Sequence, residues 1–395
     1  MNTKVKEIFI MRAFACSSVV LLHSIGIVQV TYELSISVHS ILRALQLLLL
    51  YATPMFVFMS EFVLSYSYGS DLPKGFFKKR LRYILVPYIF FGIFYALVWA
   101  YGFSITDKRA ILGQIGLYVF RGDYHGYFVL IIFQFYLLHK IFSKRLDRLP
   151  IKATLIISML FNILYLAFFN YTVWLDYAHI PFARYIWTRG YFMLFPAWIF
   201  YFILAYYAGQ RVETFYKITK KFVCLLIPVV AGCGFIILYQ YKTELLAVIS
   251  TKRPDVVPYT LAAIMLFFYG SSFVQRIPKG VDLINRCSYS IYLLHPFVQQ
   301  LIQLFIIRTN SLRNPMSALL AVFILSLYVP ILITILVNRW PLGHLLVGNL
   351  GPSGIEKEIG TGVLTKKVLP KILKEVKGNL ISQGSLKENE ETTSK

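Results

Sequence analysis

The hydrophobic positions of this chain fall in long blocks rather than in stripes that repeat with helical spacing. Residues 83–103 and 316–338, for example, contain few or no charges. An α-helix of about 20 apolar residues spans the hydrocarbon core of a bilayer. Inside hydrocarbon only helices and closed barrels satisfy every backbone polar group, and these blocks lack the alternation of barrel strands. The pattern therefore predicts an all-α, polytopic membrane bundle.

Lysine and arginine are concentrated in alternate loops and at the N-terminus. Such an excess marks the cytoplasmic side of a membrane protein. We therefore expect both termini in the cytoplasm and a multi-pass protein of the cell membrane. The blocks predict ten transmembrane helices, at residues 8–30, 40–66, 83–103, 122–142, 152–172, 191–209, 221–241, 256–275, 286–307 and 316–338.

The long apolar blocks end near residue 340. We therefore divide the chain into a transmembrane domain, residues 1–340, and a tail, residues 341–395. Within 355–377 apolar residues recur at helical spacing between lysines, as in a basic amphipathic helix on a membrane surface. Pro370 interrupts that helix. Residues 378–395 are rich in Lys, Glu, Ser and Thr and are expected to be disordered. We therefore expect a cytoplasmic tail that contacts lipid.

Composition agrees with a membrane protein. Of 395 residues, 57% are hydrophobic and 15% charged, whereas a soluble domain is about 45–50% apolar and about a quarter charged. The net charge of +22 is explained by topology and by attraction to anionic lipid, so no nucleic-acid partner is expected. The spacing of the four cysteines predicts neither a disulfide framework nor a metal site.

Two ionisable residues lie in the first predicted helix, Arg12 and His23. Eleven steps of 100° place them within about 20° of one face, about 16 Å apart along the axis. A guanidinium can bind phosphate or carboxylate in bidentate fashion, and a neutral imidazole can act as a general base. The alternative is that Arg12 extends to the headgroups and His23 bonds a neighbouring helix.

Glu61 is a carboxylate placed well inside the second apolar block, directly after Ser60. An ionisable group at membrane depth needs a partner or water, which makes it a functional candidate. Glu61 and Arg12 lie at a similar depth, so we expect them to pair. Such a pair could serve a substrate site or simply join two helices.

The ninth predicted helix contains Tyr292, His295 and Pro296. Proline removes a backbone donor and kinks a helix, which frees a carbonyl about one turn earlier. A kinked helix that presents Tyr and His inward suits a polar cavity, and it suits a hydrogen-bonded helix contact almost as well.

A cluster of basic residues precedes the third predicted helix, with Lys79, Arg80 and Arg82 followed by Pro87 and Tyr88. Cytoplasmic topology alone can explain these charges. They could equally form a cradle for an anionic donor such as coenzyme A.

Together these motifs resemble the acyltransferase 3 family of membrane O-acyltransferases over about residues 5–340. The family's Arg/Lys–ten residues–His pattern matches Arg12 and His23. Its other motifs match Phe56–Phe62, the Arg80–Tyr88 stretch, His125-Gly126-Tyr127-Phe128, and Ser288, Tyr292, Leu293 and His295. Within the family, the chain is most similar to the branch that accompanies poly-N-acetylglucosamine synthesis in biofilm polysaccharides. Glu61 departs from the pattern, because the family has glycine there.

The resemblance implies an enzyme that transfers an acetyl or succinyl group from cytosolic acyl-CoA, used as a co-substrate without further cofactor, to a hydroxyl of an extracytoplasmic polysaccharide or lipid-linked sugar. It implies that His23 is catalytic. The residues expected to contact substrate are Arg12, Ser60, Glu61, His125, Tyr292 and His295, and Lys79, Arg80 and Arg82 are expected to bind acyl-CoA. Exopolysaccharide export is the alternative function, and a scaffold for a polysaccharide synthase is a third.

Overall fold

The structure is a computed structural model that describes residues 5–246, 248–348 and 350, and all regular elements in that part of the chain are helical. This confirms the predicted all-α class. The elements are α1 (Lys6–Thr31), α2 (Ile36–Leu48), η1 (Leu49–Tyr51), α3 (Ala52–Tyr68), α4 (Phe76–Arg80), η2 (Leu81–Leu85), α5 (Val86–Gly102), α6 (Lys108–Arg121), η3 (His125–Tyr127), α7 (Phe128–Leu146), α8 (Ile151–Tyr171), η4 (Trp174–Tyr177), α9 (Ala183–Tyr185), η5 (Ile186–Gly190), α10 (Tyr191–Met193), η6 (Phe195–Trp198), α11 (Ile199–Gln210), α12 (Val212–Lys242), α13 (Val256–Ser272), α14 (Lys279–Thr309), α15 (Pro315–Val337) and α16 (Gly343–Val347).

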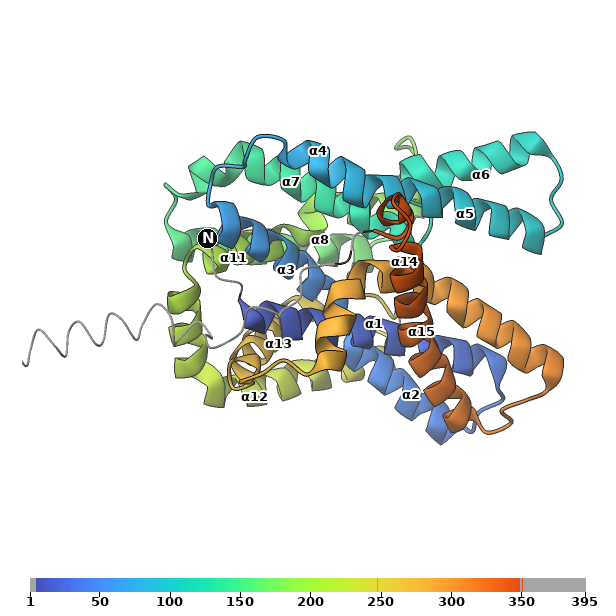
Figure 1. Cartoon of the computed structure of the whole chain (residues 1–395). Coiled ribbons are helices and arrows are strands. Elements are labelled where there is room, and N and C mark those ends of the chain that lie inside the picture. The colour runs from blue at the N-terminus through green and yellow to red at the C-terminus, as the bar shows by residue number, and fades with distance from the viewer. Residues whose placement is uncertain (1–4, 247, 349, 351–395) are drawn as a thin grey trace, which may run out of the picture.

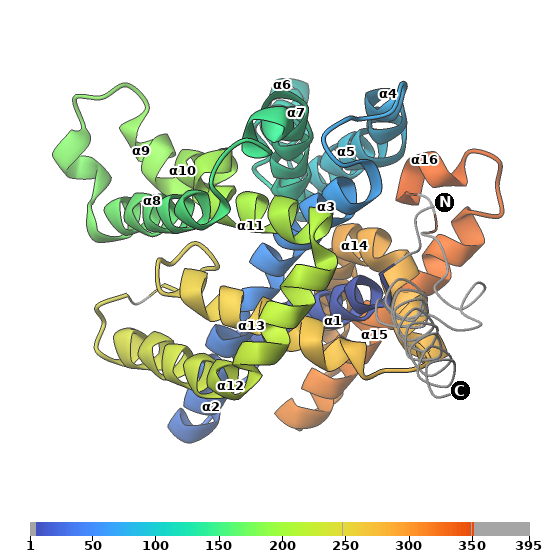
Figure 2. The same ribbon diagram turned by 90° about the vertical axis from the view of Figure 1, so that its left-hand side faces the viewer.

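Helix α1 lies at the centre of the bundle, surrounded by α3, α13, α14 and α15 (Figure 2). Polar side chains join it to α14 within the apolar interior. The Nε2 amide of Gln299 donates to Ser24 Oγ at 3.1 Å, and that of Gln303 donates to Thr31 Oγ1 at 3.1 Å. Interhelical hydrogen bonds of this kind in membranes contribute on average about 0.6 kcal/mol each, so they fix the rotation of α1 against α14 more than they stabilise the fold.

A glycine allows α11 to lie directly against α3. A Cβ atom at Gly209 would stand 2.6 Å from the Phe62 carbonyl oxygen. One turn away, the Ser65 hydroxyl donates to the Tyr206 carbonyl at 2.7 Å. Small residues at helix contacts let backbones approach closely in membranes. Gly209 therefore allows the close packing of α11 on α3.

The number of spanning helices differs from the ten predicted. In the described residues, eight helices are long and apolar enough to cross a membrane, or nine if the pair 183–193 and 195–210, bent by 44°, counts as one. Helix α13 is apolar but shorter. The bend falls at Leu194, whose backbone is extended, directly before η6.

Several predicted spans begin too late, because the helices start at Phe76, Val212 and Lys279 rather than at 83, 221 and 286. Two further boundaries differ at backbone breaks. The fourth span begins at Lys108 rather than 122, because α6 and α7 form one long crossing that is interrupted at Gly122, whose φ is +63°. The second span begins at Ile36 rather than 40 and changes to a 3-10 turn at Leu49–Tyr51. Apolar blocks reveal that a span exists, but such breaks depend on local backbone geometry.

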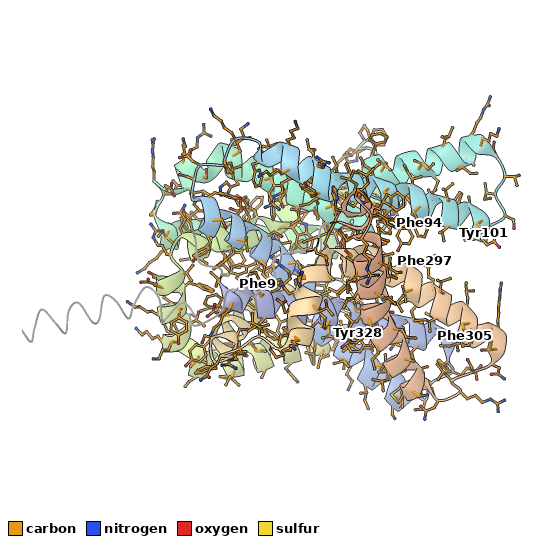
Figure 3. The ribbon with its side chains drawn as sticks, viewed as in Figure 1. Phe9, Phe94, Tyr101, Phe297, Phe305 and Tyr328 are labelled. Atoms are coloured by element: carbon orange, nitrogen blue, oxygen red, sulfur yellow. The ribbon has the colours of Figure 1, made fainter. Side chains whose placement is uncertain are left out.

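The outer surface of the bundle is apolar and aromatic. Tyr101, Phe305 and Tyr328 are 90%, 57% and 50% exposed, and Figure 3 shows them at the periphery. By contrast, Phe94 of α5 meets Phe297 of α14 edge-on, with ring centroids 4.9 Å apart. Large apolar side chains facing outward on long helices are expected where the solvent is hydrocarbon, so the protein is a membrane protein.

The connections between helices lie at the two ends of the bundle in the alternation that the loop charges predict. The α5–α6 and α14–α15 connections lie at one end, and the start of α1 and the α3–α4 connection lie at the other (Figure 1). Which end faces the cytoplasm stays a prediction. The predicted amphipathic helix at 355–377 and the predicted disordered segment 378–395 lie outside the described residues.

Candidate active site

A cavity of about 440 Å³ lies between α1, α3, α7 and α14. Its wall combines arginines, tyrosines and apolar side chains, and it extends along α14 from Arg286 to His295. Of the residues predicted from sequence, the structure brings five to this wall: Arg12, Ser60, Arg80, Tyr292 and His295.

Two arginines from distant parts of the chain meet at the cavity. Arg12 comes from α1, and Arg80 ends α4, where its guanidinium lies 5.0 Å from the Phe76 ring and 5.3 Å from the Tyr136 ring. Among the described residues neither guanidinium forms an ion pair or a side-chain hydrogen bond. Unpaired guanidinium groups bind carboxylate and phosphate strongly, so this part of the wall is suited to an anionic ligand.

The ring of His295 has a defined orientation and a free nitrogen. His295 Nδ1 lies 2.8 Å from the Ile291 carbonyl oxygen. Because a carbonyl can only accept, Nδ1 carries the proton and Nε2 carries the lone pair. Nε2 is buried and has no hydrogen-bond partner in the described part of the chain. The cavity therefore ends at a neutral imidazole that can accept a proton or a hydrogen bond.

Three histidines gather at this end of the cavity. The His295 ring centroid lies 5.4 Å from that of His23 and 6.1 Å from that of His125. His23 is exposed, although it belongs to the central helix and is not part of the cavity wall itself. No other described residue makes a hydrogen bond to the His23 imidazole. The three rings form a small cluster that joins α1, η3 and α14, which we call the histidine cluster.

Helix α14 holds His125 in this cluster. The Leu293 carbonyl of α14 accepts from Tyr95 Oη at 2.9 Å and lies 3.1 Å from His125 Nε2. The Tyr292 hydroxyl donates to the His125 carbonyl. The expectation that Pro296 frees a carbonyl about one turn earlier, near Tyr292, stays a prediction.

The predicted Arg12–Glu61 pair was wrong. Glu61 Oε1 lies 2.6 Å from His139 Nδ1, both side chains are fully buried, and Glu61 Oε2 has no hydrogen-bond partner in the described residues. Glu61 does not line the cavity. Equal depth in the membrane did not determine pairing, because α3 turns Glu61 toward α7 while Arg12 faces the cavity. The pair joins two helices, which was the second reading offered for Glu61.

Three further residues were predicted to bind substrate or acyl-CoA, and they differ in whether they line the cavity. Lys79 and Arg82 are exposed and are not part of its wall, so Arg80 alone of the three predicted acyl-CoA-binding residues lines the cavity. Ser60 lines the cavity, although its hydroxyl donates to the Phe56 carbonyl of its own helix at 2.9 Å.

The sequence analysis missed His139 and Asn285. His139 lies within an apolar block, so the rule that flagged Glu61 could also have found it. Asn285 lines the cavity, and its buried Oδ1 has no hydrogen-bond partner in the described residues. In the sequence, Asn285 is simply a polar residue at the start of an apolar stretch. That pattern is too common to identify a site residue. Within the described residues no group of three or more His, Cys, Asp or Glu side chains could hold a metal ion.

Comparison with known proteins shows the family to which the chain is related. A family model described as an acyltransferase domain matches residues 5–335. The chain is 32% identical to YfiQ of Bacillus subtilis (strain 168), a protein named as a candidate membrane-bound acyltransferase, over 88% of this chain and 95% of YfiQ.

The chain is also 25% identical to a protein of Staphylococcus aureus (strain NCTC 8325 / PS 47) named as a candidate poly-β-1,6-N-acetyl-D-glucosamine export protein, over 74% of this chain and 81% of that protein. A protein of Staphylococcus epidermidis with the same name is 25% identical over 74% of this chain and 80% of its own length. No solved structure matches significantly.

Proposed function

This chain belongs to the acyltransferase 3 family, and from that membership we propose that it transfers an acyl group from cytosolic acyl-CoA to a hydroxyl of a polysaccharide or lipid-linked sugar on the opposite side of the cell membrane. The observation that carries the proposal is the cavity, which has unpaired Arg12 and Arg80 in its wall and ends at His295 beside His23. An anion-binding group and a proton acceptor are the two features that acyl transfer from a phosphorylated thioester requires.

The donor binds with its phosphates at Arg12 and Arg80. Arg12 and His23 are about 16 Å apart along α1, so the long arm of coenzyme A must lie along the cavity to bring its thioester to the histidine cluster. Lys79 and Arg82, which are exposed beside Arg80, attract the anionic donor to this end without contacting it inside the cavity. Holding donor and acceptor together replaces a bimolecular encounter with a positioned one.

The chemical step is attack of a sugar hydroxyl on the thioester carbonyl. His23 takes the proton of the hydroxyl as the C–O bond forms. The C–S bond then breaks, and the thiolate of coenzyme A leaves and is protonated. The lone pair of His295 Nε2 accepts a hydrogen bond from the acceptor sugar, and His125 and Tyr292 complete the polar surface around it. A general base of this kind contributes about 10²–10⁴ in rate.

The experiment compares acyl content and secretion of the polysaccharide in cells that carry the wild type, His23→Ala or His179→Ala. His179 is an exposed histidine outside the cavity, which makes it a matched control. We expect His23→Ala, at normal membrane level, to abolish detectable acylation while secretion continues. Acylation close to wild type in that variant would refute the proposal.

Polysaccharide export is the second candidate function, and the names of the staphylococcal relatives favour it. The aromatic side chains around the histidine cluster would then serve as stacking surfaces for a moving sugar chain. An exporter has no evident need for a proton acceptor and an anion site joined by one cavity. Lost secretion with intact acylation in His23→Ala cells would favour export.

A further inference from the structure

The connection between α12 and α13 brings a lysine to the histidine cluster. The Lys252 ammonium lies 4.1 Å from the centroid of the Phe192 ring and 5.0 Å from that of the Tyr127 ring. Tyr127 belongs to the same short helix as His125, η3. A cation from a loop therefore stands beside η3, the short helix that contributes His125 to the histidine cluster.

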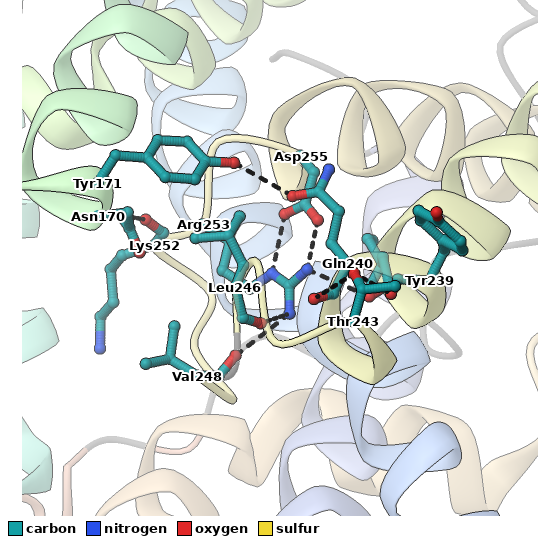
Figure 4. Close-up of polar contacts among 11 residues, drawn as sticks. Asn170, Tyr171, Tyr239, Gln240, Thr243, Leu246, Val248, Lys252, Arg253 and Asp255 are labelled. Atoms are coloured by element: carbon teal, nitrogen blue, oxygen red, sulfur yellow. Dashed lines mark hydrogen bonds and ion pairs between the residues drawn. The ribbon is translucent and has the colours of Figure 1, made fainter.

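A buried arginine fixes the loop that carries Lys252 (Figure 4). Arg253 is fully buried, and its Nε and Nη2 donate to the two carboxylate oxygens of Asp255 at 2.9 and 2.5 Å. Its remaining donors reach the backbone carbonyls of Leu246, Val248 and Ile237 at 3.0–3.3 Å. All five N–H groups of the guanidinium are thus used. Arg253 binds the loop to α12 and is not available to a ligand.

The backbone of Lys252 is held from the other side. The Asn170 amide of α8 donates to the Lys252 carbonyl at 2.9 Å. The loop backbone at Lys252 is therefore fixed by two independent anchors, and the ammonium contacts the Phe192 and Tyr127 rings. A preorganised side chain loses less conformational freedom when it binds a ligand.

The Lys252 ammonium is only partly satisfied. Cation–π contacts attract the charge but accept no conventional hydrogen bonds, and an ammonium has three N–H donors. Among the described residues the ammonium has no hydrogen-bond or ion-pair acceptor. Lys252 is half-buried, so a ligand can reach it. The purely structural alternative, a lysine that packs its stem on two rings, does not require its charge to lie beside η3, which carries His125.

We infer that Lys252 binds an anionic oxygen group, a carboxylate or phosphate, on one of the two reactants at the histidine cluster, and so makes the transfer selective for a charged substrate. This rests on the proposed acyltransferase function. The group can come from two sources: a substituent of the acceptor sugar, or the far end of an acyl group derived from a dicarboxylic acid. Arg12 and Arg80 bind the opposite part of the donor, so they do not compete for this group.

The test uses the full-length protein in detergent and compares the wild type with Lys252→Gln, Lys252→Arg and Lys242→Gln. Lys242 is an exposed lysine at the end of α12 and serves as the matched control. Three substrate pairs separate the sources: acetyl-CoA with a neutral N-acetylglucosamine oligomer, succinyl-CoA with the same oligomer, and acetyl-CoA with an oligosaccharide that carries carboxylates.

We expect Lys252→Gln to raise the KM of one charged substrate about 10- to 100-fold, the range given by loss of a charge-assisted hydrogen bond. The neutral pair should change less than about twofold, and Lys252→Arg should retain most of the affinity. The charged pair that is affected identifies the source. Equal losses on neutral and charged pairs would assign Lys252 a structural role and overturn the inference.

A binding measurement keeps the test independent of catalysis. Thermal unfolding of the wild type and of Lys252→Gln is followed with and without succinate, inorganic phosphate and the carboxylated oligosaccharide. We expect at least one of these anions to stabilise the wild type more than Lys252→Gln. If the wild type transfers no acyl group but shows this difference, the proposed function fails and the anion site stands. Identical shifts in both proteins would refute the site.

Discussion

His23 of α1 and His295 of α14 lie with their ring centroids 5.4 Å apart and their planes inclined by 43°. His295 Nε2 has no hydrogen-bond partner among the described residues, since Nδ1 is bonded to the Ile291 carbonyl. The two imidazoles are thus neighbours at the end of the cavity, where His295 forms part of the wall and His23 lies beside it.

His295→Asn tests whether the Nε2 lone pair is used. The asparagine amide can replace the Nδ1–H donor to the Ile291 carbonyl, but it places no acceptor where Nε2 stands. We expect transfer to fall about tenfold or more, the effect of a lost substrate hydrogen bond of about 1.5 kcal/mol. The measurement is initial rate with purified protein. Unchanged kcat/KM would show that only His23 meets the substrate.

The arginines of the cavity wall should control donor affinity. Arg12→Gln and Arg80→Gln each remove one unpaired guanidinium, and we expect the KM for acyl-CoA to rise about 10- to 100-fold. Arg82→Gln is the matched control, because Arg82 is exposed and outside the wall; its effect should be small and should disappear at high salt. Steady-state kinetics with varied acyl-CoA decide the question, and a larger effect in Arg82→Gln would place the donor elsewhere.

The Glu61–His139 pair should act on stability rather than on transfer. His139→Leu leaves a buried carboxylate without its partner, and loss of one member of a buried pair costs about 3–5 kcal/mol. The double variant Glu61→Met/His139→Leu should recover most of that loss, because no uncompensated charge remains. Thermal unfolding in detergent measures both. A double variant as unstable as His139→Leu would contradict this account, and lost transfer in a stable double variant would assign the pair a catalytic task.

Gly209 tests the close contact of α11 with α3. An alanine there would place its Cβ 2.6 Å from the Phe62 carbonyl oxygen, so the two helices must separate. Overpacking of this kind costs about 1–3 kcal/mol. We expect a lower unfolding temperature for Gly209→Ala, whereas Gly232→Ala, at a site with open space, should be neutral or slightly stabilising. Equal unfolding temperatures for the two variants would show that α11 can move away without cost.

The sequence by itself determined the class of the molecule and much of its chemistry. Long apolar blocks specify transmembrane helices because hydrocarbon offers no partner to an open backbone. Ionisable residues inside those blocks identified Arg12, His23 and His295, since such residues are costly without a function or partner. Helical spacing also predicted Arg12 and His23 on one face of α1.

Only the tertiary structure decided which of these groups meet. Depth along a helix does not specify rotation about its axis, so Glu61 pairs with His139 and not with Arg12. Breaks at Gly122 and Leu194 changed the number and limits of the spans. The sequence did not identify Lys252 as a site residue, because it is one of many lysines in loops. Its position beside the histidine cluster depends on the buried Arg253–Asp255 pair. Contacts between residues far apart in sequence arise from packing, which local periodicity does not encode.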